Sequence, residues 1–147
     1  MTVTGTIAEI LNAKGHTIWS ISPDTTVFDA IQLMSDKNVG ALPVTEGGKL
    51  VGMLTERDYT RKIALKGKSS KQTAVREIIS QPVTVQPDHT IEECMRLMTE
   101  RRVRHLPVLE EGTLVGIVSI GDLVNWIISA QTSQIHQLQT YISGYPG

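Results

Sequence analysis

The hydrophobic and polar positions of the chain form one pattern that occurs twice. Residues 26–34 begin with a hydroxyl residue and an acid three positions apart, and their apolar residues recur at steps of three and four. This spacing predicts a helix with one buried face, begun by a capping box in which the hydroxyl and the acid satisfy free backbone donors. Two apolar runs follow at 41–44 and 50–54, joined by a turn that contains glycines, and they predict a pair of strands.

The second copy of the pattern needs no gap to match the first. Residues 21–63 align with residues 85–127, and 16 of the 43 aligned positions are identical. A short apolar segment precedes each copy, at 7–11 and at 75–79, and both segments are predicted to be helical. The first copy holds four extra residues, which we place in a loop around 12–16. Each copy is predicted to fold as strand, helix, strand, strand, helix.

The duplication predicts an α/β (α+β) fold of two β-α-β-β-α repeats. Repeat one is assigned to residues 1–67 and repeat two to residues 68–130, with a helical extension and tail at 131–147. After Asp122 the apolar positions step by three and four as far as Ile142, which predicts a long C-terminal helix with a narrow apolar seam. The pattern leaves open whether this seam packs on its own domain or forms a homodimer contact.

The composition of the chain argues against nucleic acids and membranes as its partners. The formal net charge is -1 and aromatic residues make up 4% of the chain, so nothing indicates a nucleic-acid-binding surface. No apolar run approaches the roughly 20 residues of a membrane span, and the first residues lack a signal-peptide pattern. Cys94 is the only cysteine, which excludes an intramolecular disulfide. We expect a soluble cytoplasmic protein whose partner is neither a membrane nor a nucleic acid.

The residue types that support catalysis or metal binding lack the spacing that these functions need. The histidines do not pair with one another or with Cys94 at the helical spacing of metal ligands, so no metal site is predicted. Cys94 falls on the apolar face of the second copy's helix, where we expect it to pack. The string Gly67-Lys68-Ser69 lacks the preceding glycine of a phosphate-binding loop. No nucleophile, base and orienting group are recognisable, so no catalytic residue and no catalytic cofactor are predicted.

One motif recurs at the start of the last helix of each copy: glycine, two apolar residues, a hydroxyl residue, two variable residues and aspartate. The motif consists of Gly52, Thr55 and Asp58 in repeat one and of Gly116, Ser119 and Asp122 in repeat two. In one interpretation the hydroxyl and the acid form a capping box. In the other, the carboxylate accepts the two hydroxyls of a ribose, while the hydroxyl residue and free backbone donors meet a phosphate. The two roles are compatible.

The ordered set of a capped helix, a Leu-Pro-Val strand and this motif, present twice between about Ile7 and Ile128, resembles a tandem pair of CBS domains, named for cystathionine β-synthase. The resemblance implies two repeats related by a pseudo-twofold axis, with two clefts between them. Clefts of this family commonly bind adenosine-containing ligands, and such pairs usually sense rather than catalyse. We therefore expect a regulatory adenine-nucleotide sensor that binds AMP, ADP or ATP, with NAD(H) or S-adenosylmethionine as alternatives.

The resemblance also implies which residues line each cleft. In the cleft that ends at Asp122, it implies Asp122 at the ribose and the lining residues Thr17, Val39, Gly40, Ala41, Arg104, His105, Ile117, Ser119 and Gly121, with the arginine and the histidine at the phosphates. In the cleft that ends at Asp58, it implies Met53, Thr55, Arg57, Asp58, Val83 and Val103, together with Arg104. Repeat one has no cationic counterpart of Arg104 and His105, so the Asp58 cleft must take its charge from Arg57, Arg61 or Lys62 or bind a different ligand. We expect a compact monophosphate at Asp122 and a longer or weaker ligand at Asp58. The alternative for Arg104 is a surface basic cluster with Arg101 and Arg102.

The expected output of the sensor lies outside this chain. Because no catalytic domain accompanies the repeats, we expect the ligand to shift a conformational or dimer equilibrium that a separate effector protein senses. A homodimer is expected, as is common in the resembling family. Two other classes of function remain open: a scaffold or oligomerisation module whose clefts bind no ligand, and a small enzyme.

Overall fold

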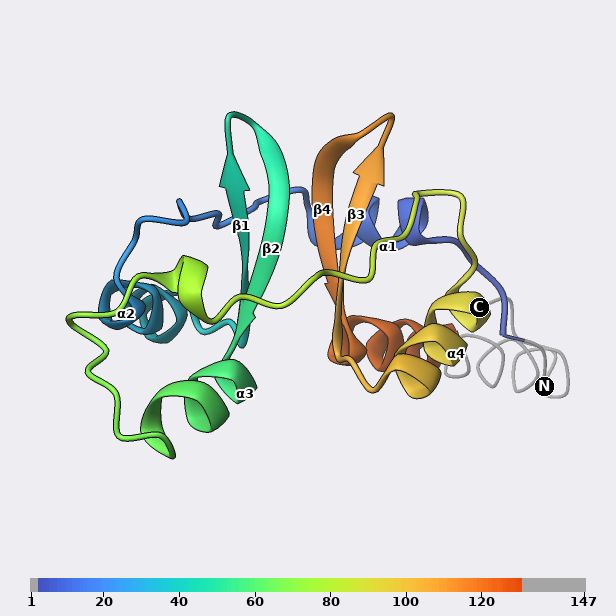
Figure 1. Ribbon diagram of the computed structural model, residues 1–147. Helices are drawn as coiled ribbons and strands as arrows, with labels where there is room; N and C mark the ends of the chain where they lie inside the picture. The colour runs from blue at the N-terminus through green and yellow to red at the C-terminus, as the bar shows by residue number, and fades with distance from the viewer. Residues whose placement is uncertain (1–2, 131–147) are drawn as a thin grey trace, which may run out of the picture.

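The computed structural model describes residues 3–130, in which two β-hairpins lie side by side at the centre (Figure 1). In repeat one, β1 (Ala41–Glu46) pairs antiparallel with β2 (Lys49–Thr55). In repeat two, β3 (His105–Glu110) pairs antiparallel with β4 (Thr113–Ser119). Both predicted strand pairs are therefore confirmed. β2 and β4 contact one another, so these two strands form the seam between the repeats.

The helix before each hairpin begins at the predicted capping residue. These helices are α2 (Val27–Lys37) and α4 (Ile91–Arg101). Thr26 Oγ1 accepts a hydrogen bond from the backbone N–H of Asp29 at 3.1 Å, and Thr90 Oγ1 accepts one from that of Glu93 at 3.0 Å. Glu93 in turn accepts from the Thr90 N–H at 3.2 Å, which completes the capping box in repeat two. In repeat one only the hydroxyl half of the box is formed, and the acid there is the shorter aspartate.

The predicted first strand of each repeat is reduced to a single bridge. Ile21 forms a parallel bridge with Val44, and Val85 forms one with Val108. In both repeats a proline follows two residues after the bridge and begins a turn. Because proline has no N–H to donate, it ends the ladder there.

A helical segment follows each hairpin, as the motif predicts. α3 (Glu56–Tyr59) follows β2 and continues into a π-helical turn (Thr60–Ala64). In repeat two, residues 120–130 are helical, so the predicted C-terminal helix begins where it was expected. Most of its seam, together with the extension at 131–147, lies outside the described residues.

The segment that precedes each repeat packs on the other repeat. α1 (Ile7–Lys14) precedes repeat one in the chain, yet its buried residues belong to the hydrophobic core of repeat two. Conversely, the 3₁₀ turn Val75–Glu77 precedes repeat two, and its buried Val75 belongs to the core of repeat one. The Ile7 N–H donates to the carbonyl of His89, and the Val75 N–H donates to that of Thr25. The boundary between residues 67 and 68 thus separates the two copies of the sequence pattern. The hydrophobic core of each repeat, however, includes residues from the other side of this boundary.

The extra residues of the first copy are helical for the most part. The sequence placed them in a loop around 12–16, whereas α1 continues to Lys14 and ends at Gly15, which has a φ of 97°. Four residues correspond to about one helical turn. The insertion therefore lengthens α1 and carries its last residues farther along β4, which α1 contacts.

Apolar side chains of the described residues fill one core in each repeat. Cys94 is fully buried in the core of repeat two, which confirms that it packs, and burial raises the pKa of its thiol to about 11. Within residues 3–130, no helix combines the length and the apolar character that crossing a membrane requires.

Candidate functional site

A cavity of about 690 Å³ lies between the two repeats on the side of Asp58. We call it the Asp58 cavity, and its lining residues come from both halves of the chain. All seven residues that the sequence assigned to this cleft line it, namely Met53, Thr55, Arg57, Asp58, Val83, Val103 and Arg104. Further lining comes from Gly40, Glu56, Arg61, Ser80, Gln81, Pro82, Arg102 and His105.

The Asp58 carboxylate caps the helix that follows it. Its Oδ2 accepts from the Thr55 backbone N–H and from Thr55 Oγ1, each at 3.0 Å, while Thr55 Oγ1 accepts from the Asp58 N–H at 3.1 Å. Its Oδ1 accepts from the Ser80 hydroxyl at 2.9 Å and lies 3.2 Å from the Lys62 ammonium. The capping interpretation of the motif is therefore confirmed here. The ribose role stays a prediction, and it would require ligand hydroxyls to replace the donors on Oδ1.

The apolar wall of the Asp58 cavity is held by backbone pairing between the repeats. Met53 of β2 and Ser80 exchange two backbone hydrogen bonds, each 3.0 Å long. This bridge fixes the segment that leads through Pro82 to Val83 beside β2. Side chains of this type offer an uncharged surface to the flat face of a base.

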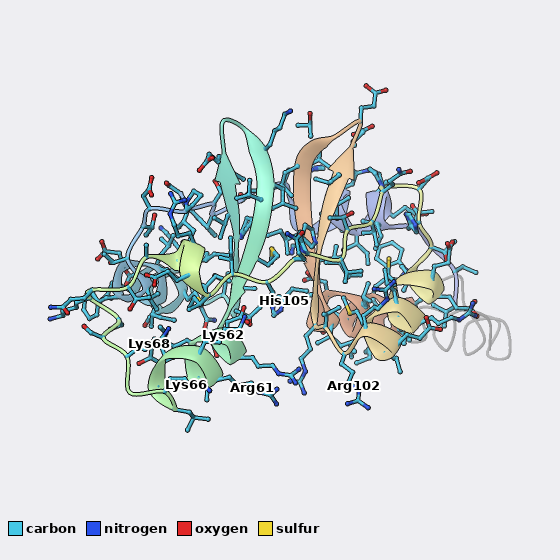
Figure 2. All side chains as sticks on the ribbon, in the orientation of Figure 1. Arg61, Lys62, Lys66, Lys68, Arg102 and His105 are labelled. Atoms are coloured by element: carbon cyan, nitrogen blue, oxygen red, sulfur yellow. The ribbon has the colours of Figure 1, made fainter. Side chains whose placement is uncertain are left out.

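Cationic side chains surround the mouth of the Asp58 cavity from both repeats. Arg57 and Arg61 belong to α3 and the π-helical turn, and Arg102 and Arg104 lie between α4 and β3. Arg57 Nη1 donates to the Arg102 carbonyl at 3.4 Å and so connects the two repeats. Figure 2 shows Arg61 and Arg102 on the same side of the molecule, one from each repeat. Arginine is suited to phosphate because its planar fork donates two parallel hydrogen bonds.

The sequence assigned Arg104 to both clefts and His105 to the Asp122 cleft, and both residues line the Asp58 cavity. The turn between α4 and β3 faces α3 of repeat one across the seam, as the hydrogen bond from Arg57 to the Arg102 carbonyl shows. Burial lowers the pKa of His105, so its imidazole is neutral near pH 7. The fixed positive charge of this site therefore comes from its arginines.

The Asp122 carboxylate also caps a helix, and it is paired with a cation. Asp122 Oδ2 accepts from the Ser119 N–H at 2.8 Å, and the Asp122 N–H donates to Ser119 Oγ at 3.1 Å. Lys14 Nζ donates to the same Oδ2 at 2.7 Å and to the carbonyl of Ile117 at 2.9 Å. Lys14 was not among the predicted site residues. The four-residue insertion was the one signal for it, because the insertion decides where α1 ends.

Some of the other residues predicted for the Asp122 cleft lie together, because His105 pairs with Ser119 and a Cβ on Gly40 would lie 3.6 Å from the His105 ring, whereas others lie elsewhere. Val39 and Gly40 line a separate groove of about 460 Å³ beside α2 and α3. Ala41 is buried on β1, whereas Thr17 and Gly121 are exposed. Within the described part of the chain, no group of three or more His, Cys, Asp or Glu residues is placed to hold a metal ion.

Comparison with known proteins gives the same two units. The family model described as the CBS domain matches residues 14–65 and again residues 75–129. The chain is 39% identical over 150 residues to the mitochondrial CBS domain-containing protein CBSX3 of Arabidopsis thaliana, which covers 95% of this chain and 72% of the relative. It is 41% identical over 105 residues to the CBS domain-containing protein YhcV of Bacillus subtilis, covering 71% of this chain and 74% of the relative.

Solved structures share the fold over most of the chain. A proposed signal-transduction protein with CBS domains from Burkholderia ambifaria superposes with a TM-score of 0.84 at 48% identity, covering 86% of this chain and 96% of that one. A hexameric CBS-CP12 protein from bloom-forming cyanobacteria superposes with a TM-score of 0.73 at 32% identity, covering 84% of this chain and 72% of that one.

Proposed function

Since this chain belongs to the CBS-domain family, we propose that it is a non-catalytic regulator that binds an adenine nucleotide in the Asp58 cavity. One observation carries the proposal: a single cavity joins an apolar wall, a carboxylate and four arginines drawn from both repeats. Its volume of about 690 Å³ lies within the range of roughly 300–1,000 Å³ that small-molecule sites occupy.

The adenosine half of the ligand corresponds to the apolar side of the cavity. Met53, Val83 and Val103 offer a surface for the base. Asp58 lies at the end of β2, where its Oδ1 is held by a neutral hydroxyl that a ribose hydroxyl can replace without leaving a buried acceptor unpaired. Exchange of one hydroxyl donor for another keeps the number of hydrogen bonds constant.

The arginines favour a ligand with more than one phosphate. Four guanidinium groups line the mouth against the two acids Glu56 and Asp58, which leaves an excess of two positive charges for the ligand. The four guanidinium forks can bind more phosphate oxygens than the single phosphate of AMP presents, so ADP and ATP are favoured, and the diphosphate of NAD(H) is an alternative. S-adenosylmethionine carries a sulfonium and no phosphate, so the arginines disfavour it. The sequence predicted a longer or weaker ligand for Asp58, and the proposal retains the longer one.

Regulation would follow from the position of the ligand across the seam. A nucleotide held by Arg57 and Asp58 of repeat one and by Arg102 and Arg104 of repeat two stabilises the arrangement of the repeats in which all four groups reach it. The hexameric cyanobacterial relative supports an oligomer as the responding assembly. We retain a homodimer and a separate effector protein as the proposed route of output. A cytoplasmic location is likewise retained, although one relative is named as mitochondrial.

Calorimetric titration with ATP, ADP, AMP, NADH and S-adenosylmethionine tests the proposal. A hydrogen bond to a charged group contributes about 1.5–3 kcal/mol, so Asp58→Ala should weaken ATP binding roughly 10- to 100-fold. Asp122→Ala is the matched control because it removes the equivalent cap outside the cavity. If both variants lose stability and neither loses affinity, the carboxylate only caps and the proposal is wrong.

Two further comparisons address the phosphates and the other classes of function. Arg104→Gln should weaken ATP binding far more than adenosine binding, whereas Arg101→Gln, which lies outside the lining, should change neither. Absence of binding for all five ligands at millimolar concentration would favour a ligand-free scaffold. Steady release of phosphate from ATP in the same samples would favour an enzyme.

A further inference from the structure

The two acids of the motif are approached by different groups although they occupy equivalent positions. Asp58 and Asp122 are 64 residues apart, as are Met53 and Ile117. At the first acid, Ser80 donates its backbone N–H to the Met53 carbonyl at 3.0 Å and its hydroxyl to Asp58 Oδ1 at 2.9 Å. The shortest contact of Asp58 Oδ1 is therefore with a neutral hydroxyl, and the Lys62 ammonium lies farther away at 3.2 Å.

At the second acid one ammonium makes both contacts. Lys14 Nζ donates to the carbonyl of Ile117 at 2.9 Å and to Asp122 Oδ2 at 2.7 Å. These are the counterparts of the carbonyl and the carboxylate that Ser80 contacts in the other repeat. The Lys14 side chain is 38% exposed and that of Asp122 is 21% exposed, and Asp122 lines neither of the two cavities described above.

The position of Lys14 results from the longer first segment of the chain. α1 is held in the core of repeat two by Ile7, Ile10 and Leu11, which are at most 3% exposed. Leu11 packs against Gly116, one residue before Ile117 on β4. The four extra residues then extend the helix past this anchor and bring Lys14 to the carboxylate. The second segment has no such extension and continues past Ile79 as backbone paired with β2.

A lysine near Asp58 differs from Lys14 in geometry. Lys62 Nζ lies 3.2 Å from Asp58 Oδ1, but it donates to the carbonyl of Ile78 at the shorter distance of 2.9 Å. Lys62 also does not line the Asp58 cavity. The ammonium of Lys14, in contrast, makes its shortest contact with the acid itself.

We infer that Lys14 occupies the Asp122 carboxylate in place of a ribose, so that this chain binds nucleotide at Asp58 and not at Asp122. The inference rests on the proposed function of the Asp58 cavity. A ribose hydroxyl that reaches Asp122 has to replace a salt bridge, in which both partners are charged, with a hydrogen bond in which only the carboxylate is charged, and the exchange leaves the Lys14 ammonium without its acid. No arginine offsets this loss, because repeat one has Gly40 and Ala41 where repeat two has Arg104 and His105.

The test is an amide NMR titration of the full chain with AMP to millimolar concentration, which detects weak sites. In the wild-type protein the amides of Thr55 and Asp58 should shift saturably, and those of Ser119 and Asp122 should not. In Lys14→Met the Ser119 and Asp122 amides should also shift, with an affinity at least roughly tenfold above wild type. Lys14→Arg keeps the ion pair and should behave as wild type.

The controls separate the two proposals. Lys49→Met removes an exposed lysine from the first position of β2 and should leave both sites unchanged. Thermal unfolding of Lys14→Met should remain cooperative, because the lysine takes no part in the core that anchors α1. Saturable shifts at Ser119 in the wild type, or none there in Lys14→Met, overturn the role of Lys14. Absence of shifts at Thr55 and Asp58 in every variant overturns the proposed function instead.

Discussion

The packing of α1 on the other repeat predicts the consequence of adding one methyl group to β4. A Cβ placed on Gly116 would lie 2.6 Å from Leu11 Cδ2 and 3.0 Å from its Cδ1. Leu11 is only 1% exposed, so its side chain has no free space to move into. Overpacking a core site costs about 1–3 kcal/mol, and replacing a strand glycine with alanine otherwise gains about 0.5–1 kcal/mol. We expect Gly116→Ala to lower the free energy of unfolding by about 1–2 kcal/mol.

A double-mutant cycle identifies Leu11 as the cause. Leu11→Ala alone should cost about 2–5 kcal/mol because it removes a buried side chain. In the double variant Leu11→Ala with Gly116→Ala, the added methyl group enters space that the leucine has vacated. The two effects should then be less than additive by about 1–3 kcal/mol.

Urea denaturation followed by circular dichroism measures each free energy of unfolding. Gly52→Ala serves as the matched control, because the added methyl group there would meet Ile79 Cδ1 at 2.8 Å rather than Leu11. Its effect should add to that of Leu11→Ala within about 0.5 kcal/mol. If the effects of Gly116→Ala and Leu11→Ala on the free energy of unfolding also add within about 0.5 kcal/mol, Leu11 does not pack against Gly116. The packing of α1 on β4, and with it the exchange of the first segments between the cores, is then refuted.

Two further predictions concern titratable groups in the core and at the seam. Burial raises the pKa of the Cys94 thiol to about 11, so at pH 8 a thiol reagent should modify Cys94 only in molecules that have unfolded locally or globally. Rapid modification of the native protein would contradict the burial of Cys94. Burial also lowers the pKa of His105 from its ordinary 6.5, so the unfolded state binds more protons as the pH falls through that value. Stability should therefore fall more steeply from pH 7.5 to 5 in wild type than in His105→Gln, as measured by urea denaturation, and equal slopes would contradict the lowered pKa.

The sequence predicted those helices and strands that are fixed by interactions between residues close together in the chain. Thr26 and Thr90 begin helices because each lies three residues before the backbone N–H that it satisfies. The hairpins follow from apolar runs separated by a glycine turn, and the motif aspartates cap because Thr55 and Ser119 are their near neighbours. The residues of the Asp58 cleft that lie on β2 and α3 were placed by the resemblance to the CBS family and not by local spacing.

The remaining features of the site depend on contacts between distant parts of the chain. Lys14 and Asp122 are 108 residues apart, and their pairing depends on how far a four-residue insertion extends a helix held in the opposite core. The assignment of Arg104 to a cleft depended on which face of repeat two meets repeat one. Two repeats with nearly the same pattern do not reveal which surfaces face each other, so the sequence placed this arginine at both clefts, and the structure places it in the lining of the Asp58 cavity.

The sequence by itself determined the two repeats, their helix starts and strand pairs, and the family to which the chain belongs, because these follow from periodicity and from hydrogen bonds between near neighbours. Only the tertiary structure decided that the first segments exchange cores, that the arginines gather at Asp58, and that a lysine lies on Asp122. These features depend on the packing of one repeat against the other, where burial of apolar side chains fixes the relative position of groups that are far apart in the chain.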